Sequence, residues 1–196
     1  SFSFYANKII TTGEGGMIVT DDEETAERAR AYRNLCFKKT KRFYHTEMGE
    51  NFRMTNLQAA VGVAQMEQID RFVRIKREMA RKYSEGLAGI PGIKLPVEKP
   101  GVKNVYWMYA IELAEESRSD AAKLASFLAD RGIATRPFFL GLHEQPVFRK
   151  MGLFVGERYP VAERIAQQGI YLPSGLTITD EQIDKVIGAI REMFSV

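Results

Sequence analysis

The chain has 196 residues, of which 45% are hydrophobic and 27% charged, an ordinary globular composition that permits a buried core. Its net charge of +3 is a mild bias that suits anionic ligands without requiring nucleic acid. The single cysteine, Cys36, excludes an internal disulfide framework and fits a reducing, cytoplasmic compartment, and no long apolar run predicts a membrane span.

The first twenty residues predict a hairpin around one lysine. Residues 1–4 alternate as a strand does, and the glycine-rich stretch 11–16 indicates a turn with unusual backbone angles. Residues 15–20 then favour a short returning strand. Lys8 lies between apolar residues, and poor solvation there would lower the pKa of its amine and make it a nucleophile toward a carbonyl. On pattern alone, an ordinary surface lysine beside a turn is the favoured interpretation.

A helix is predicted over roughly 22–33, with Thr20 or Asp21 as its cap. The segment 34–50 that follows interleaves aromatic and basic side chains; the basic ones are Lys38, Lys39, Lys41 and Arg42. Such a run could follow a nucleic-acid backbone, form a solvated loop, or provide a positive rim for a doubly charged diphosphate. The loop interpretation is favoured because the run is short.

A long apolar stripe predicts the next helix. Thr55 and Gln58 form a capping box, so a helix begins at Asn56. The stripe continues to Leu87, either in one helix or in two joined near Asp70. Its members are Leu57, Ala60, Val61, Ala64, Phe72, Ile75, Met79, Tyr83 and Leu87.

The last ninety residues alternate between strand and helix patterns. We expect strands over 105–113, 133–136 and 171–172, a helix capped by Ser119, and a final helix that begins with a Thr179–Gln182 capping box. This order is typical of an α/β layer unit. We place the domain boundary inside the long helix, which gives domains at 1–75 and 76–196.

Four stretches in order resemble one protein family: SFYANKIITTGEGGMIVT, GENFRMTNLQAAVGVAQMEQID, RPFFLGLH and GIYLPSGLTITDEQI. They are similar to the DegT/DnrJ/StrS family of sugar-nucleotide aminotransferases, which use pyridoxal 5′-phosphate. The resemblance implies an α/β, aspartate-aminotransferase-like fold (PLP fold type I). In that fold, 1–75 would end the large cofactor domain and 76–196 would form the small domain. It also implies that the chain is a C-terminal half, which we expect to be inactive alone.

The resemblance assigns roles to residues of the cofactor site. Lys8 would carry the cofactor as a Schiff base and then act as acid and base, and lysine rather than histidine at this place favours amino transfer over sugar dehydration. Ser3 would donate to the cofactor phosphate, although a strand serine satisfied by backbone is the alternative. Asn51 would reach the phosphate of a neighbouring subunit in a homodimer; its alternative is a turn-forming asparagine.

Two further residues would lie on the substrate side. Arg53 suits a carboxylate or phosphate, against the alternative of a structural salt bridge. His143 would face the sugar nucleotide, against the alternative of a packed histidine. Two histidines and one cysteine without ligand spacing predict no metal site.

The resemblance therefore implies a cytoplasmic aminotransferase that moves an amino group from glutamate to a keto-sugar nucleotide. The acceptor would be a 4-keto-6-deoxyhexose, in surface-polysaccharide or amino-sugar biosynthesis. The alternatives are a sugar dehydratase of the same family, a nucleic-acid-binding module, and a non-enzymatic fragment.

Overall fold

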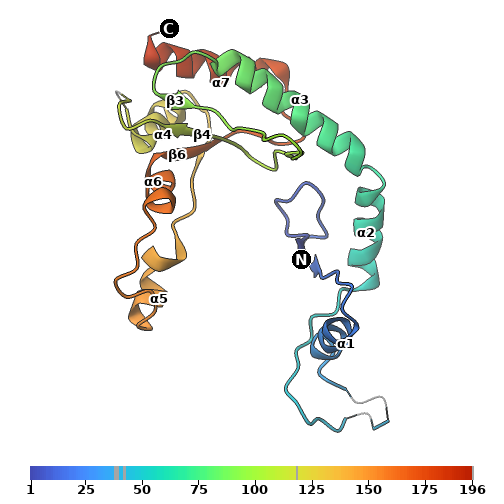
Figure 1. Ribbon diagram of the computed structural model, residues 1–196. Coiled ribbons are helices and arrows are strands. Elements are labelled where there is room, and N and C mark those ends of the chain that lie inside the picture. The colour runs from blue at the N-terminus through green and yellow to red at the C-terminus, as the bar shows by residue number, and fades with distance from the viewer. Residues whose placement is uncertain (38–39, 42, 118, 196) are drawn as a thin grey trace. The chain divides into compact units, whose positions relative to one another are not determined.

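The computed structural model describes residues 1–37, 40–41, 43–117 and 119–195, and the chain divides into two compact units (Figure 1). Unit 1 is Ser1–Phe72 and unit 2 is Val73–Val196. The division falls inside helix α3 (Ile69–Leu87). The sequence places its domain boundary three residues later in the same helix.

Unit 1 begins with a small hairpin. Strands β1 (Phe2–Ser3) and β2 (Gly16–Met17) pair antiparallel, with Phe2 opposite Met17. The pairing is shorter than the 15–20 strand that the sequence predicts. Between the strands, the Phe4 amide donates to the Gly15 carbonyl at 2.9 Å, so the segment from 5 to 14 forms a closed loop.

Helix α1 (Glu23–Tyr32) lies where the sequence predicts a helix, but the predicted cap is wrong. Asp22 is the capping residue, and its carboxylate accepts from the amides of Glu24 and Thr25. Asp22 immediately precedes the first helical turn, so its side chain reaches these unpaired amides. Of the basic run, Lys38, Lys39 and Arg42 lie outside the described residues. Lys41 is exposed, with its amine 4.7 Å from the Tyr44 ring centre.

Helix α2 (Asn56–Met66) begins with the predicted Thr55–Gln58 capping box. It ends before α3, so two helices form. The predicted apolar stripe is correct for α3, where Met79, Tyr83 and Leu87 are buried. It is wrong for α2, where Leu57 and Val61 are exposed in this chain. The face of α2 that packs inside unit 1 carries Gln58, Gly62 and Gln65 instead.

Unit 2 is built on a four-stranded antiparallel sheet in the order β3 (Ile93–Lys94), β4 (Tyr109–Leu113), β6 (Gly169–Leu172) and β5 (Arg136–Pro137). The predicted strand over 105–113 begins only at Tyr109, because Tyr106 has a left-handed backbone with φ +46°. The predicted strand at 133–136 also starts late. The Ile133 amide is bound to the Leu128 carbonyl and still belongs to the end of the preceding helix.

One face of this sheet forms the core of unit 2. Helices α3, α4 (Ala121–Ala129) and α7 (Asp180–Phe194) supply the opposing apolar side chains (Figure 1). The fully buried members include Tyr83, Leu87, Tyr109, Ile111, Leu113, Leu124, Leu128, Ile170 and Ile190. The cap of α4 is Asp120, which accepts from the Lys123 amide at 2.7 Å, and not Ser119 as predicted.

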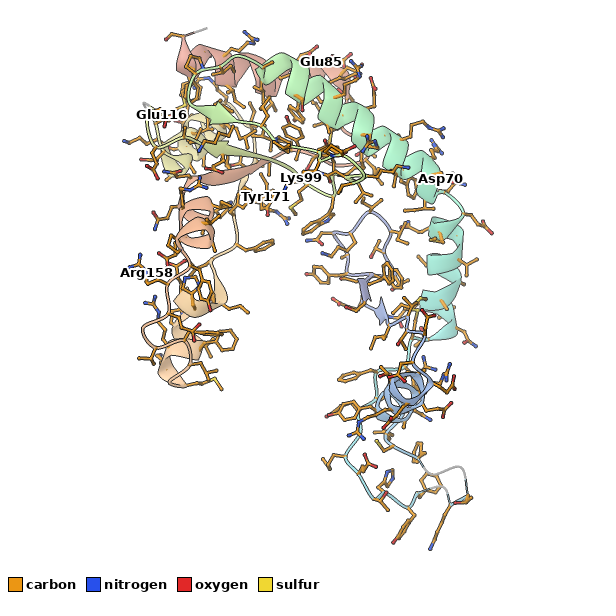
Figure 2. The ribbon with its side chains drawn as sticks, viewed as in Figure 1. Asp70, Glu85, Lys99, Glu116, Arg158 and Tyr171 are labelled. Atoms are coloured by element: carbon orange, nitrogen blue, oxygen red, sulfur yellow. The ribbon has the colours of Figure 1, made fainter. Side chains whose placement is uncertain are left out.

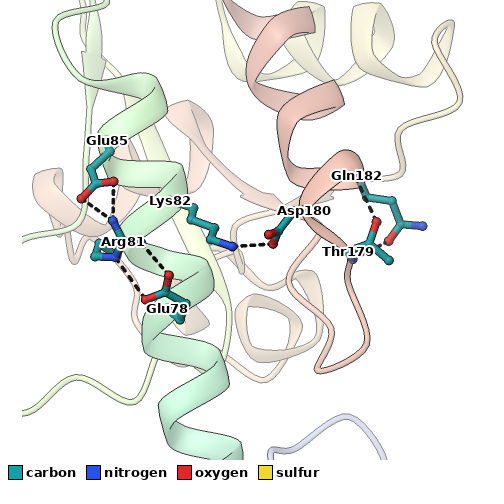
Figure 3. A network of polar contacts seen from close by, with 7 residues as sticks. All are labelled: Glu78, Arg81, Lys82, Glu85, Thr179, Asp180 and Gln182. Atoms are coloured by element: carbon teal, nitrogen blue, oxygen red, sulfur yellow. Dashed lines mark hydrogen bonds and ion pairs between the residues drawn. The ribbon is translucent and has the colours of Figure 1, made fainter.

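Polar contacts join α3 to the start of α7 (Figure 3). Lys82 of α3 pairs with Asp180 of α7 at 2.5 Å, beside the predicted Thr179–Gln182 capping box. Arg81 binds carboxylates one turn away on either side, Glu78 and Glu85. Arg81 and its partners are exposed and Lys82 is only half-buried, so the apolar core rather than the ion pairs supplies most of the stabilisation.

The sequence did not predict three short elements: the 3-10 helix η1 (Leu142–Glu144), α5 (Pro146–Lys150) and α6 (Pro160–Gln168). Pro146 and Pro160 are each the first residue of a helix, a position that proline fits well. These two prolines are the sequence feature from which α5 and α6 could have been predicted. None of the helices in the described part of the chain is both long and apolar enough to cross a bilayer.

Candidate cofactor-lysine site

Lys8 lies on the loop between β1 and β2. Its amide donates to the Tyr5 carbonyl at 3.0 Å, which closes a turn, and its side chain is half-buried. The far end of the loop is fixed as well, because the Thr12 amide and the Thr11 hydroxyl both donate to the Phe4 carbonyl. Because both ends of the loop are anchored, the backbone of Lys8 has a defined position. A nucleophile needs such a position to meet the carbonyl carbon that it attacks.

Two glutamines of α2 anchor the same loop, and the sequence analysis missed both. Gln65 Oε1 accepts from the Thr11 amide at 2.9 Å, and Gln58 Nε2 donates to the Glu14 carbonyl at 3.2 Å. Gly62 lies between them, where an added Cβ would be 2.9 Å from the Thr12 methyl group. The available signal was the spacing of 58, 62 and 65, which places two polar residues and a glycine on one face of an otherwise apolar helix.

Ser3 lies in β1 within the same hairpin. Ser3 is exposed, and within the described residues its Oγ accepts one long hydrogen bond, 3.4 Å, from the Tyr5 amide. The hydroxyl proton therefore remains able to donate to an anion. Ser3 and Lys8 thus lie on one short segment, Ser3 in β1 and Lys8 in the loop that follows it.

Asn51 and Arg53 lie on a second segment of unit 1. Asn51 is exposed and forms an isolated antiparallel bridge with Asn34, and Arg53 donates to the Asn34 side chain at 2.6 Å. Gly49 permits this pairing, since a Cβ there would lie 2.5 Å from the Cys36 amide nitrogen. The side chain of Asn51 is thus presented to solvent at a fixed backbone position.

His143 is a buried residue of unit 2. Its Nε2 lies 3.2 Å from Glu163 Oε1, and its ring packs edge-on against Tyr159 at 4.9 Å. The Arg158 guanidinium binds the same carboxylate and, with the Tyr159 amide, lowers the pKa of Glu163 to about 2. This environment is that of a packed, hydrogen-bonded histidine, which the sequence analysis left as the alternative.

The site residues therefore fall into groups. Ser3 and Lys8 share the first hairpin, Asn51 and Arg53 share the segment after α1, and His143 belongs to unit 2. Within the described ranges, no three histidine, cysteine, aspartate or glutamate side chains are grouped to bind a metal ion.

Comparisons with known proteins identify the family of the chain. A model of the DegT/DnrJ/EryC1/StrS aminotransferase family matches residues 1–191. GDP-perosamine synthase of Escherichia coli O157:H7 is 34% identical over 195 residues, which are 100% of this chain and 51% of that protein. The putative pyridoxal phosphate-dependent aminotransferase EpsN of Bacillus subtilis is 33% identical over 195 residues, 98% of this chain and 50% of EpsN. The chain spans about half the length of the curated relatives it matches.

A solved structure confirms the predicted fold class. The crystal structure of DesV from S. venezuelae, in complex with a ketimine intermediate, superposes with a TM-score of 0.84 at 33% identity. The match covers 100% of this chain and 51% of DesV.

Proposed function

Because the chain belongs to the DegT/DnrJ/EryC1/StrS aminotransferase family, we propose that its protein transfers an amino group to a keto-sugar nucleotide with pyridoxal 5′-phosphate as cofactor. The chain covers half the length of its relatives, so this activity concerns the whole protein. The observation that carries the proposal is Lys8, a half-buried lysine on a loop anchored at both ends.

The residues present fit part of a cofactor site. When bound, the cofactor supplies an aldehyde for the amine and an electron sink for the carbon that loses its proton. Lys8 Nζ would hold the cofactor and, when released, accept and return that proton. Ser3 Oγ has a proton to donate to a phosphate oxygen, and Asn51 would contribute an amide donor.

The relatives support a narrower version of the proposal. The name GDP-perosamine synthase among them supports a sugar nucleotide as substrate. From the family resemblance we further propose a 4-keto-6-deoxyhexose nucleotide as acceptor, glutamate as donor and a place in surface-polysaccharide biosynthesis. Arg53 and His143 remain candidates for the substrate side. Arg53 is exposed and already bound to Asn34, whereas His143 is buried and would act through its neighbours.

We also propose a cytoplasmic homodimer in which Asn51 completes the neighbour's site. The exposure of Asn51 on a fixed segment supports this role. A sugar dehydratase is disfavoured because Lys8 stands where the resemblance gives dehydratases a histidine, and nothing in the comparisons favours a nucleic-acid-binding module.

Chemical fixation of the cofactor tests the role of Lys8. Borohydride reduction in the presence of pyridoxal phosphate should attach the cofactor covalently to Lys8, as measured by peptide mass spectrometry. Lys8→Ala should abolish both the label and amino transfer, whereas the matched variant Lys123→Ala, at an exposed lysine of α4, should retain both. A label on Lys76 or Lys82 would refute the assignment.

A further inference from the structure

The sheet of unit 2 has a second face, opposite the core. Arg136 of β5 is directly opposite Tyr171 of β6, and residues so paired place their side chains on the same face. Because Ile170 and Leu172 point into the core and successive strand residues alternate, Tyr171 and Arg136 lie on the other face. In Figure 2, Tyr171 lies on the side of the sheet away from α3 and α7.

Three aromatic rings gather on this face, and we call them the aromatic platform: Phe138, Phe139 and Tyr171. The rings of Phe138 and Tyr171 are stacked with centres 4.5 Å apart and planes 11° apart, and Phe139 lies 6.0 Å from Tyr171. Phe139 is nevertheless 70% exposed. A large aromatic ring supported from one side and exposed on the other can accept a second flat ring.

A glycine makes room for this stack. A Cβ at Gly169 would lie 2.1 Å from Phe138 Cδ2 and 2.4 Å from Cε2, so any side chain there would displace the ring. Gly169 is opposite Glu112 in the sheet, and Phe138 donates its amide to the Gly169 carbonyl. The platform is therefore built into the strand register.

The cations on this face outnumber the carboxylate with which they pair. Glu112 is paired with both Lys94 and Arg164. Arg136 is exposed, and within the described part of the chain the structure gives it neither an ion-pair nor a hydrogen-bond partner. A guanidinium presents a planar set of donors that matches phosphate oxygens.

We propose that the aromatic platform and Arg136 bind the nucleoside diphosphate part of the sugar-nucleotide substrate, an inference that rests on the proposed function. The base stacks on Phe139, and the Arg136 guanidinium binds the diphosphate. The two residues are three positions apart and so at most roughly 10 Å from each other along the backbone, a separation that a ribose between base and diphosphate can bridge. An uncharged sugar would use the rings but leave the guanidinium without a role.

Calorimetric titration of the protein with GDP, dTDP and inorganic pyrophosphate tests the site. Arg136→Gln should weaken nucleoside diphosphate binding about tenfold or more, and Arg136→Lys should recover part of the loss. Phe139→Leu should weaken it about fivefold or more while leaving pyrophosphate binding unchanged, since only the base loses its contact. Arg74→Gln is the matched control: Arg74 is exposed on α3, the helix on the opposite face of the sheet.

Wild-type affinity in Arg136→Gln and Phe139→Leu would overturn the proposal, as would the absence of nucleoside diphosphate binding to the unmodified protein. Both side chains are exposed, so circular dichroism should show an unchanged fold. The borohydride experiment separates this inference from the proposed function. If Lys8 is labelled but the variants bind nucleoside diphosphates as the wild type does, the platform proposal alone is refuted. If the variants bind more weakly but Lys8 is not labelled, the aminotransferase proposal alone is refuted.

Discussion

Lys76 of α3 is a buried basic side chain of unit 2. It is 4% exposed, and its Nζ donates to the Ser174 carbonyl. Among the described residues no carboxylate pairs with it. Burial therefore lowers the pKa of Lys76 to about 8. The drop from 10.5 to about 8 corresponds to about 3 kcal/mol of cost for the charged form.

Replacing this lysine should make the protein more stable. Lys76→Met keeps the length of the side chain, removes the buried charge and loses one hydrogen bond, so a net gain of about 2 kcal/mol is expected at pH 7. The unfolded lysine holds its proton up to about pH 10.5, whereas the folded one releases it from about pH 8. The free energy of unfolding of the wild type should therefore rise between pH 8 and pH 10.5. Over this range, the difference in stability between the variant and the wild type should become smaller.

Guanidinium denaturation at pH 7 and at pH 10 measures this difference. Lys123→Met, at an exposed lysine of α4, serves as the control and should show little effect at either pH. Lower stability of Lys76→Met at pH 7 would mean that the contact with Ser174 outweighs the cost of burying the charge.

At the scale of elements, α2 holds the loop that carries Lys8. The helix contributes polar contacts on the face formed by Gln58, Gly62 and Gln65, and its capping box fixes where that face begins. The register of the helix therefore determines which residues reach the loop. A shift by one residue would remove both glutamine contacts.

Gln65→Met should loosen this loop without unfolding the helix. The variant keeps the side-chain length but leaves the Thr11 amide without its acceptor, which costs about 1 kcal/mol of local stability. The Thr11 amide should then exchange with solvent about fivefold faster, as measured by hydrogen–deuterium exchange. Gln68→Met provides the control, because Gln68 is exposed beyond the end of α2. Equal protection of Thr11 in both variants would contradict the anchoring role.

At the scale of the whole molecule, the proposed homodimer makes each active site depend on two subunits. Lys8 and Asn51 would then serve the same site from different chains. Mixing Lys8→Ala with Asn51→Ala subunits should therefore restore about a quarter of wild-type activity, because half of the random dimers carry one intact site of two.

Steady-state assays after mixing and subunit exchange measure this recovery. Each variant assayed alone provides the baseline, and activity of the wild type should also fall on dilution as dimers dissociate. No recovery after verified exchange, or full activity of a monomer, would contradict a shared site.

The sequence alone determined features that depend on neighbouring residues. The Thr55–Gln58 and Thr179–Gln182 capping boxes require only a hydroxyl and an amide three positions apart, and both formed as predicted. The apolar stripe of α3 was likewise readable, since a buried helix face repeats with the helical period. The turn around Lys8 was expected from its glycines, whereas the role of Lys8 is a prediction from the family resemblance.

The tertiary structure decided what depends on distant partners. The exposed apolar side of α2 and the late start of β4 arise because packing and the left-handed Tyr106 outweigh local patterns. In the sequence, Gln65 looks like an ordinary helix residue. Only the fold brings it to Thr11, which lies 54 positions earlier in the chain. The same holds for Gly169 and Phe138, because strand register, and not any local preference, brings a ring over a glycine.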